Sequence, residues 1–412
     1  MKNNFLKTVY FLAFFLLGMW TRGEARVMTL QECMDSALAN NPSVAAATLS
    51  VEKARIMKGT AFNPPFTSVT LKQETTGGGG PENGVAFNQE FEFPSIYVAR
   101  HHALDARVDL ERSRLSLLSN QLKTDISKAY HTLIYYNEIL NINTQLDTLY
   151  GTFCHIASVR LKEGEGGPLE LLNAERVREK NLRERLMIES QYAVTNTELK
   201  RLIGVQTDIT PSDTALTPLP YRASEFDFSK TPGGRTALDE ISVAEREVRV
   251  AKNEFLPGIH VGATAQAFIK SFNPYHIDRQ PFEKGNFMAF EVGISVPLFF
   301  GATSSRLKAA QMETTISRLN YEYADSEAST ELKRLTTILS TLNDKLEYFR
   351  STSLPRAKEI QRIAQVSYEY GDIDYIEYIS NIETVFSVLR EYADCIHEYN
   401  QTIIALESLK AE

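Results

Sequence analysis

Four segments, two in each of two intervals of the chain, alternate apolar and polar residues at every second position. The alternation runs from Val85 to Phe93, from Ile259 to Ile269 and from Met288 to Val296, and more weakly from Phe66 to Glu74. A period of two is typical of strands whose two faces meet different environments. Strands of about 9 to 13 residues suit a tilted crossing of a bilayer. The pattern therefore predicts two pairs of strands, at about 66–93 and about 258–296.

Other stretches follow a helical period over unusual lengths. Between Pro94 and Gly164 the chain holds no proline, and apolar residues recur at alternating spacings of three and four. The same spacing returns in a second long segment that runs to Gly371 and in the segment after it. This is the periodicity of coiled coils. A helix of roughly 70 residues extends on the order of 100 Å. Apolar seams on more than one side of such helices indicate a ring of neighbouring helices.

The chain is internally duplicated, because both halves show the order helix, strand, loop, strand, long helix, tight turn, helix. Prolines mark the expected joints between helices and strands: Pro65, Pro94, Pro257 and Pro297. We expect a first repeat at 26–204 with a hairpin tip near 164, an irregular equatorial linker at 205–233, and a second repeat at 234–412 with a tip near 371.

The repeats should begin with helices from Thr29 to Phe62 and from Thr236 to Leu256. Adding the helix lengths places both ends of the chain halfway along the rod, beside the proline-containing linker.

Four strands cannot close on themselves, and open sheet edges are not tolerated in lipid. Several copies of the chain must therefore share one barrel. Two copies would give eight strands with a filled interior, whereas three would give twelve and leave a passage. The expected fold class is mostly α, with long coiled-coil hairpins forming an α-barrel and four β-strands per protomer contributing to a trimeric twelve-stranded membrane barrel.

The first residues predict export. Lys2 and Lys7 precede an apolar run from Thr8 to Trp20, and the order is that of a secretory signal peptide, with cleavage expected near Ala25. The run is too short to span a membrane as a helix. A net charge of −8 gives no indication of nucleic-acid binding. The mean hydropathy of −0.24 argues against a helical membrane protein. Cys33, Cys154 and Cys395 lie on helix-patterned sequence and are expected to be small buried residues without a disulfide.

Several short motifs recur in a fixed order from residue 28 to 410. They are Thr29–Cys33 with Ala37–Pro42, the joints at Pro94 and Pro297, and two tip motifs, Arg160–Gly164 with Glu170–Glu175 and Tyr368–Gly371 with Glu377–Glu383. With these motifs the sequence resembles the TolC family of outer-membrane efflux channels.

The resemblance implies a homotrimer in the outer membrane of a Gram-negative bacterium, with a twelve-helix tube that extends into the periplasm. It implies contact with outer-membrane lipid, a periplasmic adaptor (membrane fusion) protein at the tips, and an inner-membrane pump of RND or ABC type. The expected function is a passive exit duct of a tripartite efflux or type I secretion system. No catalytic motif, cofactor site or metal-ligand spacing occurs in the sequence, so we expect no enzyme.

Two groups of residues are candidate functional sites. Gly164 and Gly371 mark the hairpin reversals and are candidates for docking to the adaptor, although a purely structural turn would also use glycine there. Asp372, Asp374 and Glu377 are candidates for a periplasmic gate, because a ring of carboxylates repeated by a trimer favours cations. The matching family site is an acidic, closed mouth. Solvated surface charge is the alternative.

Pro355 should break the second long helix locally. His101 and His102, and the scattered His131, His155 and His397, are expected to be ordinary helix residues.

Two other functions compete with the duct. A periplasmic adaptor or coiled-coil scaffold would carry one hairpin, and a trimeric adhesin stalk would carry one continuous helical block. The chain instead has two returning hairpins and two pairs of strands. The sequence does not identify the cargo.

Overall fold

The computed structural model describes residues 26–411 except 76–80, 223–224 and 268–286. The expected signal peptide at 1–25 lies outside these residues, as does most of both loops between the paired strands. Among the helices of the described part, none is both long enough and apolar enough to cross a membrane.

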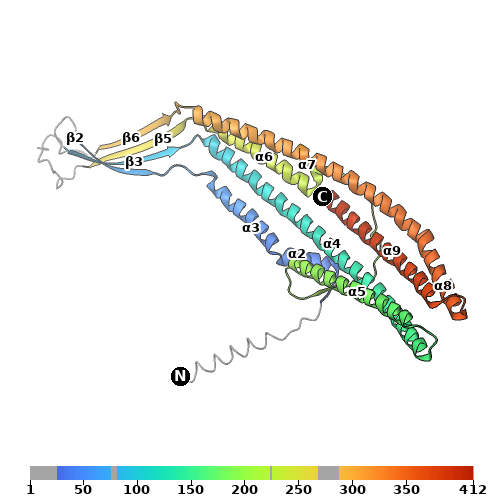
Figure 1. Ribbon diagram of the computed structural model, residues 1–412. Coiled ribbons are helices and arrows are strands. Elements are labelled where there is room, and N and C mark those ends of the chain that lie inside the picture. Colours follow the sequence, from blue (N-terminus) through green and yellow to red (C-terminus); the bar gives the residue numbers. More distant parts are fainter. Residues whose placement is uncertain (1–25, 76–80, 223–224, 268–286, 412) are drawn as a thin grey trace, which may run out of the picture. The chain divides into compact units, whose positions relative to one another are not determined.

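Helices dominate the described chain (Figure 1). In order, its elements are β1 (Arg26–Met28), α2 (Leu30–Asn40), α3 (Pro42–Met57), η1 (Lys58–Ala61), β2 (Ser68–Thr75), β3 (Pro81–Phe91), α4 (Pro94–Glu163), α5 (Pro168–Ile203), β4 (Ile209–Pro211), η2 (Phe228–Lys230), α6 (Pro232–Asn253), β5 (Gly258–Ala267), β6 (Phe287–Ser295), α7 (Gly301–Tyr348), η4 (Phe349–Ser353), α8 (Leu354–Tyr370) and α9 (Tyr375–Lys410).

The chain folds into two compact units, each built from separated stretches of sequence. The first unit, which we call the hairpin unit, comprises the described residues of 26–46, 117–231 and 327–411. The second, the sheet unit, comprises 47–116 and 232–326. Each unit contains residues from both sequence repeats. The helices α3, α4 and α7 each contribute residues to both units.

The sheet unit contains one antiparallel sheet in the order β2-β3-β5-β6. The two central strands come from different repeats and pair Phe91 with Ile259. On β6 the side chains of Met288, Phe290, Val292 and Ile294 are all exposed. The expected strands are therefore present, and β6 carries an apolar face with nothing packed on it in the described residues.

Prolines lie at the joints of the sheet unit as expected from the sequence. Pro94 is the first residue of α4, where its missing N–H costs nothing. Pro65 and Pro257 precede β2 and β5, and Pro297 follows β6. Because proline disfavours helical geometry in the residue before it, these positions separate helix from strand.

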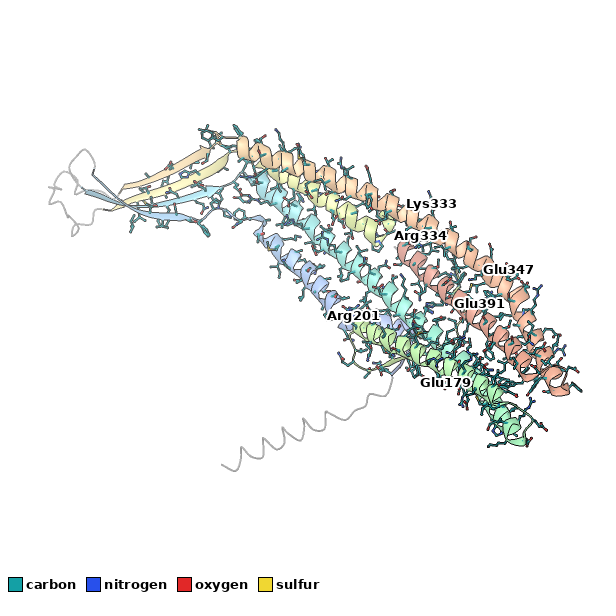
Figure 2. The ribbon with its side chains drawn as sticks, viewed as in Figure 1. Glu179, Arg201, Lys333, Arg334, Glu347 and Glu391 are labelled. Carbon is teal, nitrogen blue, oxygen red and sulfur yellow. The ribbon has the colours of Figure 1, made fainter. Side chains whose placement is uncertain are left out.

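The hairpin unit is held together by two apolar clusters. In the first, Ile142, Leu146 and Phe153 of α4 pack with side chains of α5 and α9, including Ile188 and Ile382. In the second, the leucines of α7, Leu335, Leu339, Leu342 and Leu346, pack with Ile396, Tyr399 and Ile403 of α9. The helical seams expected from the sequence are thus the observed cores. Charged side chains such as Glu347 and Glu391 project from the exposed faces of these helices (Figure 2).

Both ends of the chain meet the linker, as the helix lengths predicted. β1 pairs in parallel with β4, from Arg26 with Ile209 to Met28 with Pro211. On the other side, the side chain of Asn400 accepts a hydrogen bond from the backbone N–H of Leu219 at 2.8 Å. The linker is therefore tied to β1 and to α9 through its own backbone groups.

One helix differs from the sequence expectation, and another is interrupted where the sequence predicts a break. The helix expected from Thr29 to Phe62 is divided at Asn41, whose backbone is extended because Pro42 follows it. Thr29 and Glu32 form a reciprocal capping box at its start. The second long helix is interrupted by the π-helical η4 just before Pro355, which is the local break that proline predicted.

The three cysteines are free in the structure. Cys33 and Cys395 are buried and Cys154 is half-buried. Burial raises the pKa of the Cys33 thiol to about 11, so this side chain stays protonated and unreactive near neutral pH.

Candidate functional site

The tip of the first hairpin is a tight glycine turn. α4 ends at Glu163, and Gly164 adopts a left-handed backbone with φ 76°. The N–H groups of Glu165 and Gly166 donate to the carbonyl of Arg160 at 2.9 and 3.0 Å, which satisfies the end of the helix. The guanidinium of Arg160 lies 3.3 Å from the carboxylate of Glu170 on α5. One arginine thus ties both sides of this turn.

The tip of the second hairpin has the same geometry. Gly371 adopts φ 77°, and the N–H of Asp372 donates to the carbonyl of Ser367 at 2.7 Å. At both tips, a Cβ added to the left-handed glycine would meet no atom within 4 Å. The glycines are therefore required by backbone conformation, and the space around them is open.

The three acidic gate candidates are exposed at the second tip, but they differ in what they contact. Asp374 is the N-cap of α9, and its side chain accepts a hydrogen bond from the backbone N–H of Glu377 at 2.8 Å. Asp374 therefore stands just before the helix and not on a helix face with Glu377. Asp372 and Glu377 are exposed.

An aromatic cluster next to the tips joins the two hairpins. Phe153 of α4 packs edge-on against Tyr375 and Tyr378 of α9, with ring centroids 4.9 and 5.5 Å apart. Tyr368 of α8 stacks on Tyr378. The hydroxyl of Tyr375 is buried without a hydrogen-bond partner, and burial raises the pKa of that phenol. This cluster is an apolar contact between the hairpins.

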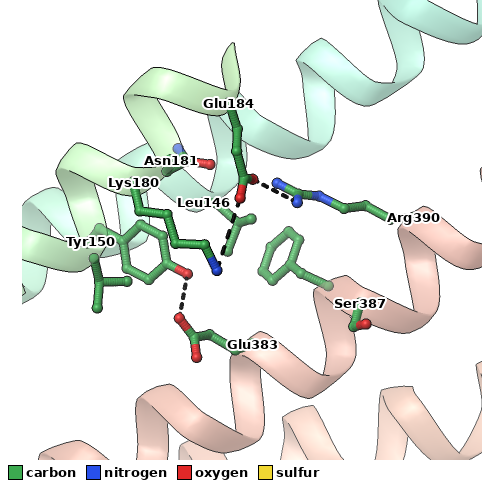
Figure 3. Close-up of a pocket in the computed structure, with 10 residues that line it drawn as sticks. Leu146, Tyr150, Lys180, Asn181, Glu184, Glu383, Ser387 and Arg390 are labelled. Atoms are coloured by element: carbon green, nitrogen blue, oxygen red, sulfur yellow. Dashed lines mark hydrogen bonds and ion pairs between the residues drawn. The ribbon is translucent and has the colours of Figure 1, made fainter. Parts of the chain in front are cut away.

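Further along the same helices, a polar cluster interrupts the apolar core; we call it the polar junction (Figure 3). Arg390 of α9 lies 2.8 Å from the carboxylate of Glu184 on α5 and donates to the side-chain oxygen of Asn143 on α4. Lys180 lies 3.9 Å from the same glutamate. Arg390 thus links α9 of the second hairpin to both helices of the first.

Two further hydrogen bonds complete the polar junction. The hydroxyl of Tyr150 on α4 donates to Glu383 on α9 at 3.0 Å, and Asn181 on α5 donates to the carbonyl of Asn143 at 2.9 Å. Burial and the neighbouring carboxylate of Glu383 raise the pKa of Tyr150, so its proton is retained for this bond.

The junction is incompletely satisfied. Asn143 Nδ2, Asn181 Oδ1 and Arg390 Nε are buried without a hydrogen-bond partner among the described residues. Asn181 and Arg390 line a cavity of about 200 Å³, with Leu146 and Phe386 on its apolar side. A cavity of this size with several polar groups can hold water molecules that satisfy those atoms. Water that reaches the cavity can solvate these polar groups when the helices separate, which a dry apolar seam does not allow.

The sequence predicted the hairpin tips, but it did not predict the polar junction. Gly164 and Gly371 lie at the reversals, and the joint prolines lie at the ends of the sheet strands. Asn143, Asn181 and Arg390 carried a weak signal, because each is polar at a position of a coiled-coil seam. From the sequence, His101 and His102 were also expected to be ordinary helix residues. In the structure their ring nitrogens and a carboxylate oxygen of Asp105 lie within 4.8 Å of one another.

Comparisons with known proteins agree with this architecture. Residues 235–411 match the family described as outer membrane efflux protein. No curated protein matches the chain. The fold is similar to that of CusC, with a TM-score of 0.74 and 18% identity over 96% of each chain.

Two further outer-membrane proteins share the fold. VceC from Vibrio cholerae matches with a TM-score of 0.72 and 17% identity, over 92% of this chain and 96% of VceC. The open state of the MtrE channel of Neisseria gonorrhoeae matches with a TM-score of 0.74 and 16% identity, over 92% of this chain and 88% of MtrE.

Proposed function

Because residues 235–411 match the outer membrane efflux protein family and the fold is similar to that of such channels, we propose that the chain is a channel of this kind, that its hairpin tips dock onto a periplasmic adaptor and that the polar junction holds its periplasmic end closed. The chain is an outer-membrane efflux channel that extends into the periplasm. Proteins of this family form trimers and work with adaptors and inner-membrane pumps. Family and fold are those of channels and not of enzymes.

The sheet supports a trimer with a shared barrel. In the described residues β2 and β6 each pair on one side only, and an unpaired edge is costly in lipid. Three copies would supply twelve strands, with the exposed apolar side chains of β6 facing outer-membrane lipid. The energy for transport is assigned to the inner-membrane partner, of the RND or ABC class.

Exposed apolar side chains beside the tip glycines support docking at the tips. Leu169 and Leu172 follow the first turn, and Tyr370 and Ile376 flank the second. Each of these residues is more than half exposed. Exposed apolar side chains that cluster in this way are typical of interaction surfaces. The open space at Gly164 and Gly371 leaves the backbone accessible to a partner.

The single observation that carries the closing role is the reach of Arg390. It contacts Glu184 and Asn143, which lie on both helices of the other hairpin. An iris-like opening that moves one hairpin from the other must break these contacts. Water that enters the cavity can replace these contacts as they break, so the junction can open and close reversibly.

The test is channel conductance in a planar bilayer, for the wild-type trimer and for Arg390→Gln. The variant loses the charge and the fork of donors, so we expect conductance or open time to rise several-fold. Arg362→Gln is the matched control, since Arg362 pairs with Glu359 on an exposed helix surface. Equal conductance of Arg390→Gln and the control would refute the closing role. Absence of conductance in wild type and variants would refute the duct itself.

A further inference from the structure

The sheet unit contains a cluster of metal-ligating side chains that the duct does not use. His101 and His102 lie near the start of α4, and Asp105 lies one turn further along the same helix. One ring nitrogen from each histidine and one carboxylate oxygen lie within 4.8 Å of one another. Among the described residues, these three form the group of histidine, cysteine and acidic side chains whose ligand atoms lie this close together.

Helical geometry explains why these three residues converge. Asp105 stands four residues after His101 and three after His102, so it lies between the two rings on the next turn. The Nδ1 atom of His101 is already 3.1 Å from Oδ2 of Asp105. Ligands of a tetrahedral zinc ion at about 2.0–2.1 Å stand roughly 3.3 Å apart. The remaining approach is a change of about 1.5 Å, which exposed side chains reach by rotation.

The carboxylate of Asp105 is prepared for this role. Its other oxygen, Oδ1, lies 2.5 Å from the ammonium of Lys58 in η1. An aspartate is ionised near neutral pH, as a carboxylate ligand must be. An outer hydrogen bond of this kind fixes the orientation of a carboxylate ligand. Oδ2 faces the imidazole ring of His101.

We propose that His101, His102 and Asp105 form a binding site for a divalent transition-metal ion of the Zn²⁺ or Cu²⁺ type. Two imidazoles and one carboxylate suit these ions better than Mg²⁺ or Ca²⁺, which prefer all-oxygen sites. Three protein ligands leave one coordination position open, which is the arrangement of an exchangeable site and not of a closed structural one. The exposure of both histidines gives an ion direct access from solvent.

The decisive experiment titrates Zn²⁺ calorimetrically into the detergent-solubilised trimer, purified without a histidine tag and stripped with a chelator. Co²⁺ provides a second reading through its visible absorption in a nitrogen and oxygen environment. We expect one ion per protomer. Loss of a direct ligand should weaken binding more than loss of an outer partner, which costs roughly 10–100-fold. His101→Asn, His102→Asn and Asp105→Asn should each weaken binding at least about tenfold.

His155→Asn is the matched control, because His155 is an exposed histidine on the same helix and lies outside the cluster. It should bind as the wild type does. Size-exclusion chromatography confirms that each variant remains a trimer, and Asp105→Asn preserves the shape of the Lys58 contact. Equal Zn²⁺ binding by wild type and the three cluster variants would overturn the proposal, as would absence of binding by the wild type. Because no conductance is measured, this outcome is independent of the duct.

Discussion

At the scale of single residues, the left-handed glycines differ in what surrounds them. Gly164, Gly204 and Gly371 all have φ near 77°. A Cβ on Gly204 would lie 2.8 Å from the carbonyl oxygen of Asn40, where the end of α5 presses on the end of α2. The same atom on either tip glycine would meet open space. Gly204 is therefore required both by its left-handed backbone and by its close contact with Asn40. The tip glycines are required by their backbone conformation alone.

We predict that Gly204→Ala destabilises the protein more than Gly371→Ala does. A left-handed residue with a Cβ costs about 1–2 kcal/mol, and overpacking adds roughly 1–3 kcal/mol. Gly371→Ala carries the first cost alone. The apparent melting temperature of each variant in the same detergent measures the difference. Equal melting temperatures would show that α2 moves away from the new methyl group without cost.

Two half-buried histidines make stability depend on pH. Burial lowers the pKa of His131 and of His397 below the ordinary value; Asp213 and Asp394 oppose this for His131 and His397 respectively. The Nδ1 atom of His397 is buried without a partner, and its ring stacks on Tyr135 at 4.4 Å. A folded-state pKa below the unfolded value means that the unfolded chain binds more protons between the two.

We therefore predict that stability is complete above about pH 6.5, the unfolded value for histidine, and falls as the pH drops below it. The double variant His131→Gln with His397→Gln should lose less melting temperature than the wild type between pH 7.5 and 5.5. His155→Gln, at an exposed position, should behave as the wild type. A double variant with the wild-type pH profile would assign the acid sensitivity to other groups.

At the scale of elements, the start of α9 combines a structural and a proposed functional role. Asp374 caps the helix through the N–H of Glu377, and its charge belongs to the acidic set proposed as a gate. A capping side chain is worth about 1 kcal/mol, and asparagine caps nearly as well as aspartate. Charge and cap can therefore be separated at this one position.

We predict that Asp374→Ala lowers the melting temperature by a few degrees, while Asp374→Asn lowers it less. The combined variant Asp372→Asn, Asp374→Asn and Glu377→Gln should retain the cap and reduce the preference for cations in bilayer recordings. Glu391→Gln, an exposed acid further along α9, is the control. Unchanged ion preference in the triple variant would leave these carboxylates with the roles of cap and solvated surface charge.

At the scale of the whole molecule, the four-stranded sheet is the part proposed to lie in the membrane. One face of β6 presents Phe290 and Val292, each with 78% of its side chain exposed. Ala289 lies on the opposite face, one position away along the same strand. In a trimer embedded in the outer membrane, the apolar face would meet lipid and the other face the passage.

We predict that Val292→Arg reduces the amount of trimer in outer-membrane fractions. An arginine facing the middle of a bilayer costs roughly 2–4 kcal/mol per copy, and a trimer contains three. Ala289→Arg introduces the same side chain on the other face and should assemble near the wild-type level. Quantitative immunoblots of heat-sensitive trimer measure both. Equal assembly of the two variants would contradict the assignment of the lipid-facing side.

The sequence by itself determined the elements, their repeat and the reversal points. Strand and helix differ in period, and glycine and proline act through the backbone of their own neighbourhood. The strands at Val85–Phe93 and Met288–Val296, α4 from Pro94 and the turns at Gly164 and Gly371 therefore followed from local pattern. The division of the first helix at Asn41 was signalled by Pro42 in the same local way. The convergence of His101, His102 and Asp105 is also local, because it lies within one helical turn.

Only the tertiary structure decided which distant residues meet. Arg390 reaches Asn143 across 247 positions, and Gly204 packs on Asn40 from another helix. Periodicity shows which face of a helix is covered, but it does not show by what. A buried polar group is satisfied by whichever partner the fold brings to it, so the polar junction and the crowding at Gly204 arise from packing between segments far apart in the chain.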